Sequence, residues 1–218
     1  MGYNVAVDGP AGAGKSTIAK LVAKKKGYIY VDTGAMFRAL AIHFLKKNIL
    51  PEDKDNIAEA CKDVEVSIAY ENDAQQVYLN GENVTSKLRT EEVGNMASRI
   101  SSVPEVRTKL LELQRELAKS KDVIMDGRDI GTVILPNADV KIYLTASVYT
   151  RAKRRFDELT EKGETCNFDA IAKDIEDRDY RDMNREIAPL KQADDAILVD
   201  SSDMTIQEVV DTICSYCK

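Results

Sequence analysis

Apolar and polar residues follow two different periods along the chain, and segments with the two periods alternate. Short apolar runs rich in β-branched residues predict strands at residues 3–7, 28–31, 123–125, 140–144 and 197–199. Helical spacing of apolar residues predicts helices at residues 15–26, 35–47, 106–119, 148–159, 168–185 and 206–214. Short apolar strands separated by helices are typical of a parallel sheet covered on both faces. We therefore expect an α/β fold.

One segment departs from this pattern. Residues 64–70 and 75–85 alternate apolar and polar positions, and Asn72-Asp73 and Asn80-Gly81 are turn signals. The segment is therefore expected to be a small antiparallel β insertion in the α/β chain. From the pattern alone, it is either a decorative hairpin or a cover for a ligand at the edge of the sheet.

Composition narrows the class of protein. The chain has 218 residues, of which 44% are hydrophobic and 31% charged, as expected for one globular domain. The net charge of −6 argues against a dedicated nucleic-acid binder but leaves room for a local basic cleft. No apolar run is long enough to span a bilayer, and a strand-like segment begins almost at the N-terminus. We expect a cytoplasmic protein with no membrane or nucleic-acid partner.

The cysteines and the histidine offer little chemistry. Of the cysteines, only Cys214 and Cys217 have a spacing typical of metal or redox sites, and zinc would need two further ligands. The single histidine, His43, lies in an apolar helical pattern. Cys61, Cys166, Cys214 and Cys217 are therefore interpreted as reduced structural thiols.

A phosphate-binding motif follows the first predicted strand and begins a predicted helix. Residues 9–16, GPAGAGKS, match G-x-x-x-x-G-K-[ST], in which backbone N–H groups and the helix N-terminus bind phosphate oxygens. Lys15 would reach the β- and γ-phosphates, and the Ser16 hydroxyl would hold Mg²⁺. The predicted ATP contacts of this loop are Gly9, Pro10, Ala11, Gly12, Ala13, Gly14, Lys15, Ser16 and Thr17.

Two further segments leave predicted strands and should reach the same sheet edge, where ligands of open α/β sheets bind. Residues 32–38, DTGAMFR, follow the second strand, and residues 125–132, MDGRDIGT, follow a buried strand. Asp126 takes the place in which such folds keep a carboxylate for Mg²⁺ or its waters. The alternative interpretation of MDGRDIGT is a solvated turn. For residues 176–186, composition alone favours a solvated helix.

The arginines favour one kind of phosphate-loop protein. ATP and a second phosphate together carry about five or six negative charges, which must be neutralised for phosphoryl transfer. Planar guanidinium groups suit this task, and the candidates are Arg38, Arg128, Arg155, Arg178 and Arg185. A GTPase needs fewer cations because its acceptor is water. A regulatory protein that only binds nucleotide would leave the acceptor-side arginines without a purpose.

Five segments together resemble bacterial-type cytidylate kinases of the nucleoside monophosphate kinase family, over residues of about 5–210. They are DGPAGAGKST, DTGAMFRA, DGRDIGTVILPNADVKIYLTAS, DRDYRDMNRE and APLKQADDAILVDSS. The resemblance implies a P-loop three-layer fold with a five-stranded parallel sheet, order 2-3-1-4-5. It also implies one kinase domain, 1–218, with an inserted monophosphate-binding subdomain at about 63–100 and a short lid at about 154–168. The insertion would then cover a ligand.

The resemblance also implies roles for single residues. Thr33 lies near the base, and Arg38 and Arg185 bind the acceptor phosphate together with Arg128. Ser98, Arg107 and Asp129 match cytosine contacts, Arg178 and Asp182 match ribose contacts, and Arg155 matches the lid that closes on ATP. The implied catalytic residues are Lys15, Arg128, Asp129, Arg155 and Arg185, and the implied metal residues are Ser16 and Asp126.

The implied reaction transfers the γ-phosphoryl group of ATP to CMP or dCMP, with Mg²⁺ as cofactor, in a protein expected to be a monomer. Base choice follows from hydrogen bonding, because Arg107 only donates and an ionised Asp129 only accepts. Cytosine offers acceptors and an amino donor, whereas uracil has a carbonyl in place of the amino group and carries a proton on N3. A kinase for UMP or AMP and a non-catalytic nucleotide-binding regulator remain the alternatives.

Overall fold

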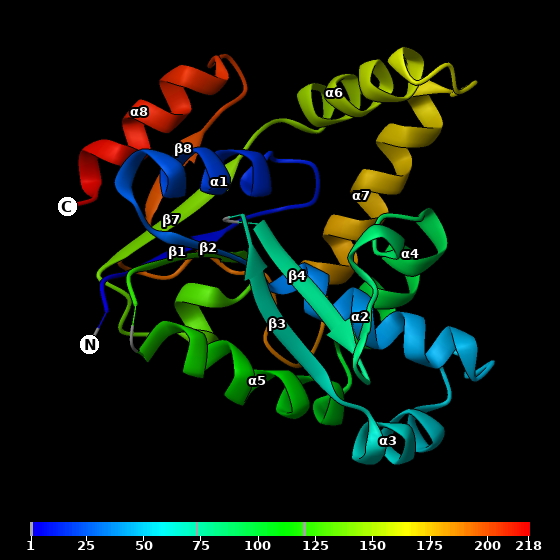
Figure 1. Cartoon of the computed structure of the whole chain (residues 1–218). Coiled ribbons are helices and arrows are strands. Elements are labelled where there is room, and N and C mark those ends of the chain that lie inside the picture. Colours follow the sequence, from blue (N-terminus) through cyan, green and yellow to red (C-terminus); the bar gives the residue numbers. More distant parts are fainter. Residues whose placement is uncertain (1, 73, 120) are drawn as a thin grey trace.

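A central parallel sheet organises the molecule, as the computed structural model of residues 2–72, 74–119 and 121–218 shows (Figure 1). Its strands lie in the order β2-β6-β1-β7-β8. They are β1 (Asn4–Asp8), β2 (Ile29–Asp32), β6 (Val123–Gly127), β7 (Val140–Thr145) and β8 (Ile197–Asp200). Numbered within this sheet alone, the order is 2-3-1-4-5, so the predicted topology is confirmed. The five predicted strands are each present within one or two residues of their expected ends.

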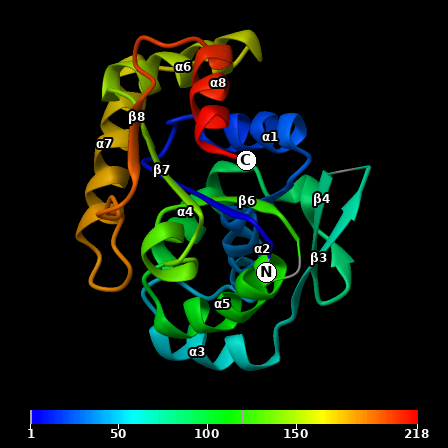
Figure 2. The same cartoon turned by 90° about the vertical axis from the view of Figure 1, so that its left-hand side faces the viewer.

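Helices cover both faces of this sheet (Figure 2). Alternate strand residues separate the two cores: Val5 and Val7 pack on one side, and Ala6 packs on the other. The first core contains α1 (Lys15–Lys26) and α8 (Ile206–Tyr216). The second contains α2 (Thr33–Lys46), α3 (Lys54–Asp63), α4 (Glu91–Ile100) and α5 (Pro104–Lys119). Burial on both faces explains why the strands read as continuous apolar runs.

Helices α3 and α4 were not predicted. Both begin with capping residues, because the side chains of Asp53 and Thr90 accept hydrogen bonds from backbone N–H groups in the first turn. The capping signals were therefore present in the sequence. A short π-helical turn, Ile130–Ile134, follows β6 and was also not predicted. Its register depends on tertiary hydrogen bonds, described below.

The β insertion forms a separate three-stranded antiparallel sheet, β3-β4-β5, as the alternating pattern predicted. Its strands are β3 (Val66–Glu71), β4 (Ala74–Leu79) and β5 (Glu82–Asn83). Asn80 and Gly81 both have positive φ, which suits a tight hairpin turn. Asn72 also has positive φ, whereas the predicted turn residue Asp73 lies outside the described residues.

Two side chains fasten this small sheet to β2 of the main sheet: Gln75, and Tyr70, whose hydroxyl donates to the Tyr30 carbonyl at 3.2 Å. The Gln75 side-chain oxygen accepts from the Asp32 N–H at 2.8 Å, and its amide donates to the Asp32 carbonyl at 3.1 Å. Because Asp32 ends β2, the insertion is bound at the carboxyl edge of the main sheet.

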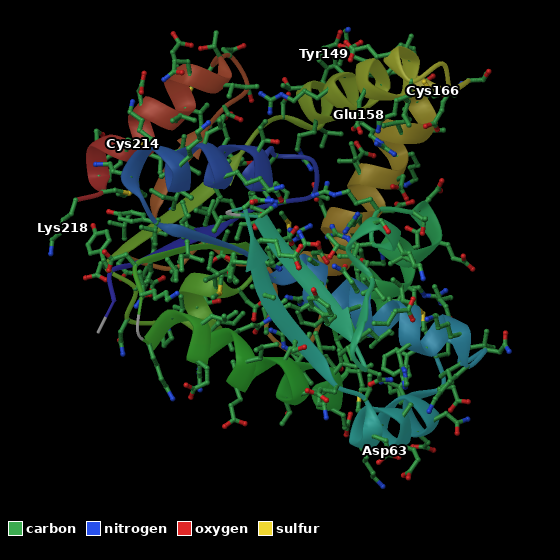
Figure 3. The ribbon with its side chains drawn as sticks, viewed as in Figure 1. Asp63, Tyr149, Glu158, Cys166, Cys214 and Lys218 are labelled. Atoms are coloured by element: carbon green, nitrogen blue, oxygen red, sulfur yellow. The ribbon has the colours of Figure 1, made fainter. Side chains whose placement is uncertain are left out.

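Helices α6 (Val148–Glu161) and α7 (Phe168–Asn184) form a pair that extends beyond the sheet (Figure 1). Tyr149 lies near the start of α6, and Cys166 lies in the connection between the two helices, at the far end of the pair (Figure 3). The rings of Tyr149 and of Phe168, the first residue of α7, have centroids 5.4 Å apart, and this contact helps to pack the two helices together. Helix α7 buries Asp179 and Asp182, so the interpretation of residues 176–186 as a merely solvated helix is wrong.

The four cysteines are free thiols, and Cys61, Cys214 and Cys217 are buried. Burial raises the pKa of Cys61 and of Cys217 to about 11, which keeps both thiols protonated and weakly reactive. Across residues 2–72, 74–119 and 121–218, none of the helices has the length and apolar content needed to cross a bilayer.

Gly9→Ala should disrupt the start of the phosphate loop. A Cβ at Gly9, whose φ is 150°, would lie 1.9 Å from the carbonyl oxygen of Leu144, which belongs to the backbone of the adjacent strand β7. We expect the unfolding free energy to fall by at least about 2 kcal/mol. Gly27→Ala is the matched control, because Gly27 also has positive φ but faces open space, which should limit its cost to about 1 kcal/mol. Equal costs in urea unfolding would show that conformational strain, not the close approach, governs Gly9.

Candidate functional site

A cleft of about 550 Å³ opens at the carboxyl edge of the main sheet. Strands β1, β2 and β6 end there in Asp8, Asp32 and Gly127, and Asp32 lies opposite Asp126 in the register. The structure brings to this cleft all the residues predicted for ATP, CMP and metal contacts except Gly9 and Pro10. Those two residues lead from β1 into the loop instead.

The phosphate loop is held in a turn around its lysine. Gly14 adopts a left-handed conformation immediately before α1, where the backbone N–H groups of the helix terminus are free for a ligand. Lys15 is 6% exposed, and its Nζ donates to the Pro10 carbonyl at 2.7 Å. Burial and the neighbouring Arg128 lower the pKa of Lys15, so this ammonium would gain from an anionic partner.

A buried ion pair between α6 and α7 holds the phosphate loop in place. The sequence did not reveal it. Arg151 and Asp179 lie 2.6 Å apart. Arg151 Nη1 donates to the Ala11 carbonyl at 2.9 Å, and Asp179 accepts from the Ala11 N–H at 3.3 Å. The phosphate loop is therefore connected directly to both helices of the pair.

Ser16 and Asp126 lie together at the N-terminus of α1. The Ser16 hydroxyl donates to Asp126 Oδ2 at 2.9 Å, and the Tyr30 hydroxyl donates to Asp126 Oδ1 at 2.8 Å. Burial, with a further contribution from Asp32, raises the pKa of Asp126 to about 6, against the opposing effect of Lys15. A nearby cation would favour the ionised carboxylate.

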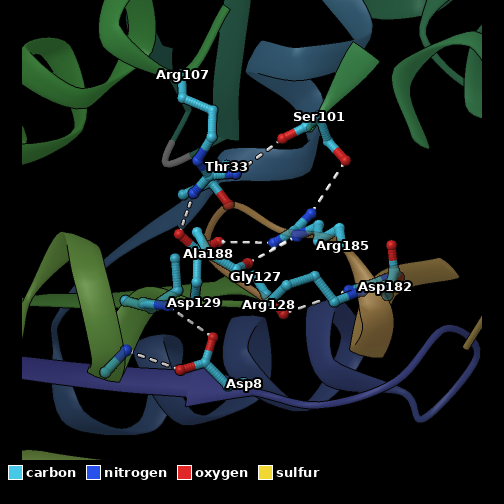
Figure 4. A network of polar contacts seen from close by, with 12 residues as sticks. Asp8, Thr33, Ser101, Arg107, Gly127, Arg128, Asp129, Asp182, Arg185 and Ala188 are labelled. Atoms are coloured by element: carbon cyan, nitrogen blue, oxygen red, sulfur yellow. Dashed lines mark hydrogen bonds and ion pairs between the residues drawn. The ribbon is translucent and has the colours of Figure 1, made fainter. Parts of the chain in front are cut away.

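On the opposite side of the cleft, two arginines meet one carboxylate (Figure 4). Asp129 is 4% exposed; it pairs with Arg107 and, at 3.4 Å, with Arg185. Ser101 supports both cations, because its carbonyl accepts from Arg107 and its hydroxyl accepts from Arg185, each at 3.0 Å. Burial raises the pKa of Asp129, whereas both arginines oppose that shift.

Further cations line the cleft between these two halves. Arg128 Nε donates to Asp182 Oδ2 at 2.8 Å (Figure 4), and the charges of Arg128 and Arg178 lower the pKa of Asp182 despite its burial. Arg178 has no hydrogen-bond partner for its buried Nε, and burial and Arg128 lower its pKa to about 10. The single carboxylate of Asp182 therefore interacts with both of these guanidinium groups.

The other predicted contacts lie around this group. Arg38 lies 3.8 Å from Asp32, and the Thr33 hydroxyl donates to the Asp126 carbonyl at 2.8 Å. The buried Ser98 hydroxyl has no hydrogen-bond partner among the described residues. Arg155 lines the cleft but is half exposed and paired with Glu158 at 2.9 Å, so it lies at the rim.

Asp8 connects the two halves of the cleft (Figure 4). Its buried carboxylate accepts from the N–H of Ile130 at 2.8 Å and from that of Gly131 at 2.7 Å. These bonds fix the π-helical turn immediately after Asp129. Burial raises the pKa of Asp8 to about 6 even though the two N–H donors oppose the shift.

Sequence reasoning missed Asp8, Tyr30, Arg89, Arg151 and Arg154 as cleft residues or their direct partners. Arg151 and Arg154 belong to a predicted helix, but its sequence alone does not show which of its arginines face the cleft. Asp8 carried a usable signal, because a carboxylate at the end of a predicted buried strand needs partners. Tyr30 carried no such signal, since tyrosine is ordinary in strands.

The fold and the cleft define a P-loop kinase: a phosphate loop and an arginine-rich acceptor side share one edge of a parallel sheet. The family model described as cytidylate kinase matches residues 5–218. The cytidylate kinase of Caldicellulosiruptor bescii is 51% identical over 96% of this chain and 93% of its own length. That of Bacillus subtilis is 45% identical over 96% of this chain and 94% of its own. The chain belongs to the cytidylate kinase family.

A solved structure of an uncharacterised protein from Eubacterium ventriosum resembles the chain in fold. Its TM-score is 0.52, at 14% identity over 99% of this chain and 98% of the other. This likeness concerns the arrangement of strands and helices alone.

Asp8→Asn should change how stability depends on pH. Because the folded pKa of about 6 exceeds the ordinary value of 3.8, the folded protein binds more protons than the unfolded chain between these values. The contribution of this carboxyl is full below the unfolded pKa, at about pH 3, and is lost as the pH rises through about 6. The advantage of the wild type over Asp8→Asn in urea unfolding should shrink by up to about 3 kcal/mol from about pH 3 to about pH 7. An advantage that grows with pH would mean that the two N–H donors outweigh burial.

Proposed function

We propose that this protein transfers the γ-phosphoryl group of ATP to CMP or dCMP, giving ADP and CDP or dCDP. The observation that carries the proposal is the group of Arg107, Asp129 and Arg185 in the same cleft as the phosphate loop. One half of the cleft suits a triphosphate, and the other offers a donor and an acceptor side by side. Membership of the family supports the same reaction.

ATP would bind along the phosphate loop with its β- and γ-phosphates at Lys15. This lysine donates only to a carbonyl now, and exchanging that partner for a phosphate would restore a full counter-charge. Residues fit for Mg²⁺ lie next to it, since Ser16 and Asp126 present oxygen ligands 2.9 Å apart. Among the described residues, no group of three or more His, Cys, Asp or Glu side chains could hold a metal by itself. That fits Mg²⁺, which commonly takes one or two protein oxygens plus phosphates and waters.

The acceptor half would orient the monophosphate without a strong general base. The second pKa of a phosphate is near 6, so an attacking oxygen is already ionised at about pH 7. Arg38, Arg128 and Arg185 surround the space between the two halves and would offset the repulsion between the phosphates. Bound Mg²⁺ would add charge neutralisation on the phosphates of ATP. Alignment and charge would therefore supply most of the rate.

Base choice would depend on Asp129 and Arg107, whose positions are fixed by Ser101 and Asp8. An ionised Asp129 accepts from the cytosine amino group, and Arg107 donates to the ring acceptors. Uracil would put a carbonyl against the carboxylate and an N–H against the guanidinium. Unpaired buried polar groups give strong discrimination.

Two segments would close over the substrates. We propose that residues of about 63–100 form the monophosphate-binding subdomain, within the single domain 1–218, and that residues of about 154–168 form the lid. The half-exposed Arg155 would then leave Glu158 for a phosphate of ATP. The expectations of a monomer, of small-molecule partners alone and of a cytoplasmic location stay predictions.

The test is a panel of nucleoside monophosphates with ATP as donor. ADP formation should be fast with CMP or dCMP and slow with UMP, AMP and GMP. Preference for UMP or AMP would make the protein a kinase for that nucleotide, and nucleotide binding without product would favour a regulator. The same panel without magnesium should give little product with any acceptor.

Asp129→Asn should reduce the discrimination between CMP and UMP. The substitution keeps the shape, removes a charge-assisted hydrogen bond worth about 1.5–3 kcal/mol, and lets the amide donate to the uracil carbonyl. The ratio of kcat/KM for CMP over UMP should fall at least about tenfold, which corresponds to about 1.4 kcal/mol. Asp182→Asn is the matched control, because Asp182 is also a buried partner of an arginine but matches a ribose contact. Asp182→Asn should lower kcat/KM for CMP and UMP by the same factor. An unchanged ratio in Asp129→Asn would show that Asp129 does not recognise the base.

A further inference from the structure

Tyr30 is a buried residue whose hydroxyl points to Asp126, one of the two residues proposed to bind Mg²⁺. It lies in β2, is 8% exposed, and packs its ring in the core beneath α1 with Ile124. Its hydroxyl reaches Asp126 Oδ1 at 2.8 Å. None of the roles implied for the reaction includes this residue.

The sheet register explains the contact. Asp32 lies opposite Asp126, and Tyr30 precedes Asp32 by two residues, so Tyr30 projects from the same face of the sheet as Asp126. Diagonal neighbours on adjacent strands are within reach of a long aromatic side chain. The phenol hydroxyl therefore approaches the carboxylate from the sheet side, whereas Ser16 approaches it from α1.

Tyr30 and Ser16 each donate to a different oxygen of the Asp126 carboxylate. Oδ1 accepts from Tyr30 and Oδ2 from Ser16, which defines the rotation of the carboxylate about its bond to Cβ. Without the Tyr30 hydroxyl, Oδ1 would be left in the core environment around the ring, and rotation would lose its restraint. Groups that hydrogen-bond a metal-binding carboxylate orient it and tune its affinity for the metal.

We propose that Tyr30 is a positioning residue that holds Asp126 in the orientation needed for magnesium–nucleotide binding. The inference rests on the proposed function, in which Ser16 and Asp126 serve the metal. Tyr30 touches neither phosphate nor base, and its whole effect passes through Asp126.

A structural role is the competing explanation and concerns the ring rather than the hydroxyl. The ring packs in the core, and Lys20 Nζ lies 5.4 Å from its centroid. Tyr30→Phe keeps these contacts and deletes one oxygen. Tyr28→Phe is the matched control, because the Tyr28 hydroxyl likewise donates one hydrogen bond, to the Lys218 carbonyl at 2.7 Å, and neither of these two residues lines the cleft.

The experiment measures affinity for β,γ-methylene ATP with magnesium and with a chelator. The ratio of the two dissociation constants is the enhancement that magnesium gives, and it is a binding quantity independent of turnover. Tyr30→Phe should reduce the enhancement about tenfold while leaving the metal-free affinity unchanged. Tyr28→Phe should leave both unchanged. In an Asp126→Asn background, Tyr30→Phe should cause no further loss.

The other outcomes separate the two proposals. If Asp126→Asn abolishes the enhancement but Tyr30→Phe leaves it intact, the positioning role is overturned and the metal assignment stands. If Tyr30→Phe weakens binding equally with and without magnesium, the residue acts through packing and the inference is again overturned. If neither Ser16→Ala nor Asp126→Asn changes the enhancement, the metal assignment fails and takes the role of Tyr30 with it.

Discussion

The structure depends on buried carboxylates at the ends of adjacent parallel strands. Asp8, Asp32 and Asp126 end β1, β2 and β6 or lie one residue before the end, and each is at most 8% exposed. A buried carboxylate is costly unless it is paired or hydrogen-bonded. Each of the three therefore recruits donors from a different segment, and these donors define the walls of the cleft.

The three aspartates act on different parts of the cleft. Asp32 caps α2 by accepting from the Ala35 N–H at 2.9 Å, and its backbone holds the β insertion through Gln75. Asp8 fixes the turn that carries Asp129, and Asp126 gathers Ser16 and Tyr30. The half of the cleft proposed for ATP and the half proposed for the monophosphate are consequently positioned from one sheet edge. This common support suits a reaction that needs two phosphates aligned within a few tenths of an ångström.

The charges of the cleft are only partly balanced. Asp129 and Asp182 each meet more than one arginine, and Arg178 keeps a buried Nε without a partner. Burial lowers the pKa values of Lys15, Arg178 and Arg185, as expected for cations removed from water. Anionic substrates would supply counter-charge to these buried cations, so the cleft is suited to phosphate groups.

The sequence by itself determined the fold and most of the cleft. Two hydrophobic periods specified the alternation of strands and helices, because burial on both faces of a parallel sheet requires continuous apolar strands. The phosphate loop, MDGRDIGT, Arg178 and Arg185 were recognisable because their chemistry is local or carries a family pattern. Helices α3 and α4 were missed although Asp53 and Thr90 marked their starts.

What only the tertiary structure decided is which distant residues meet: Tyr30 with Asp126, Asp8 with Ile130 and Gly131, and Arg151 with Ala11. These contacts depend on strand register and helix packing, which fix geometry across more than ninety residues of chain, and no local period encodes them.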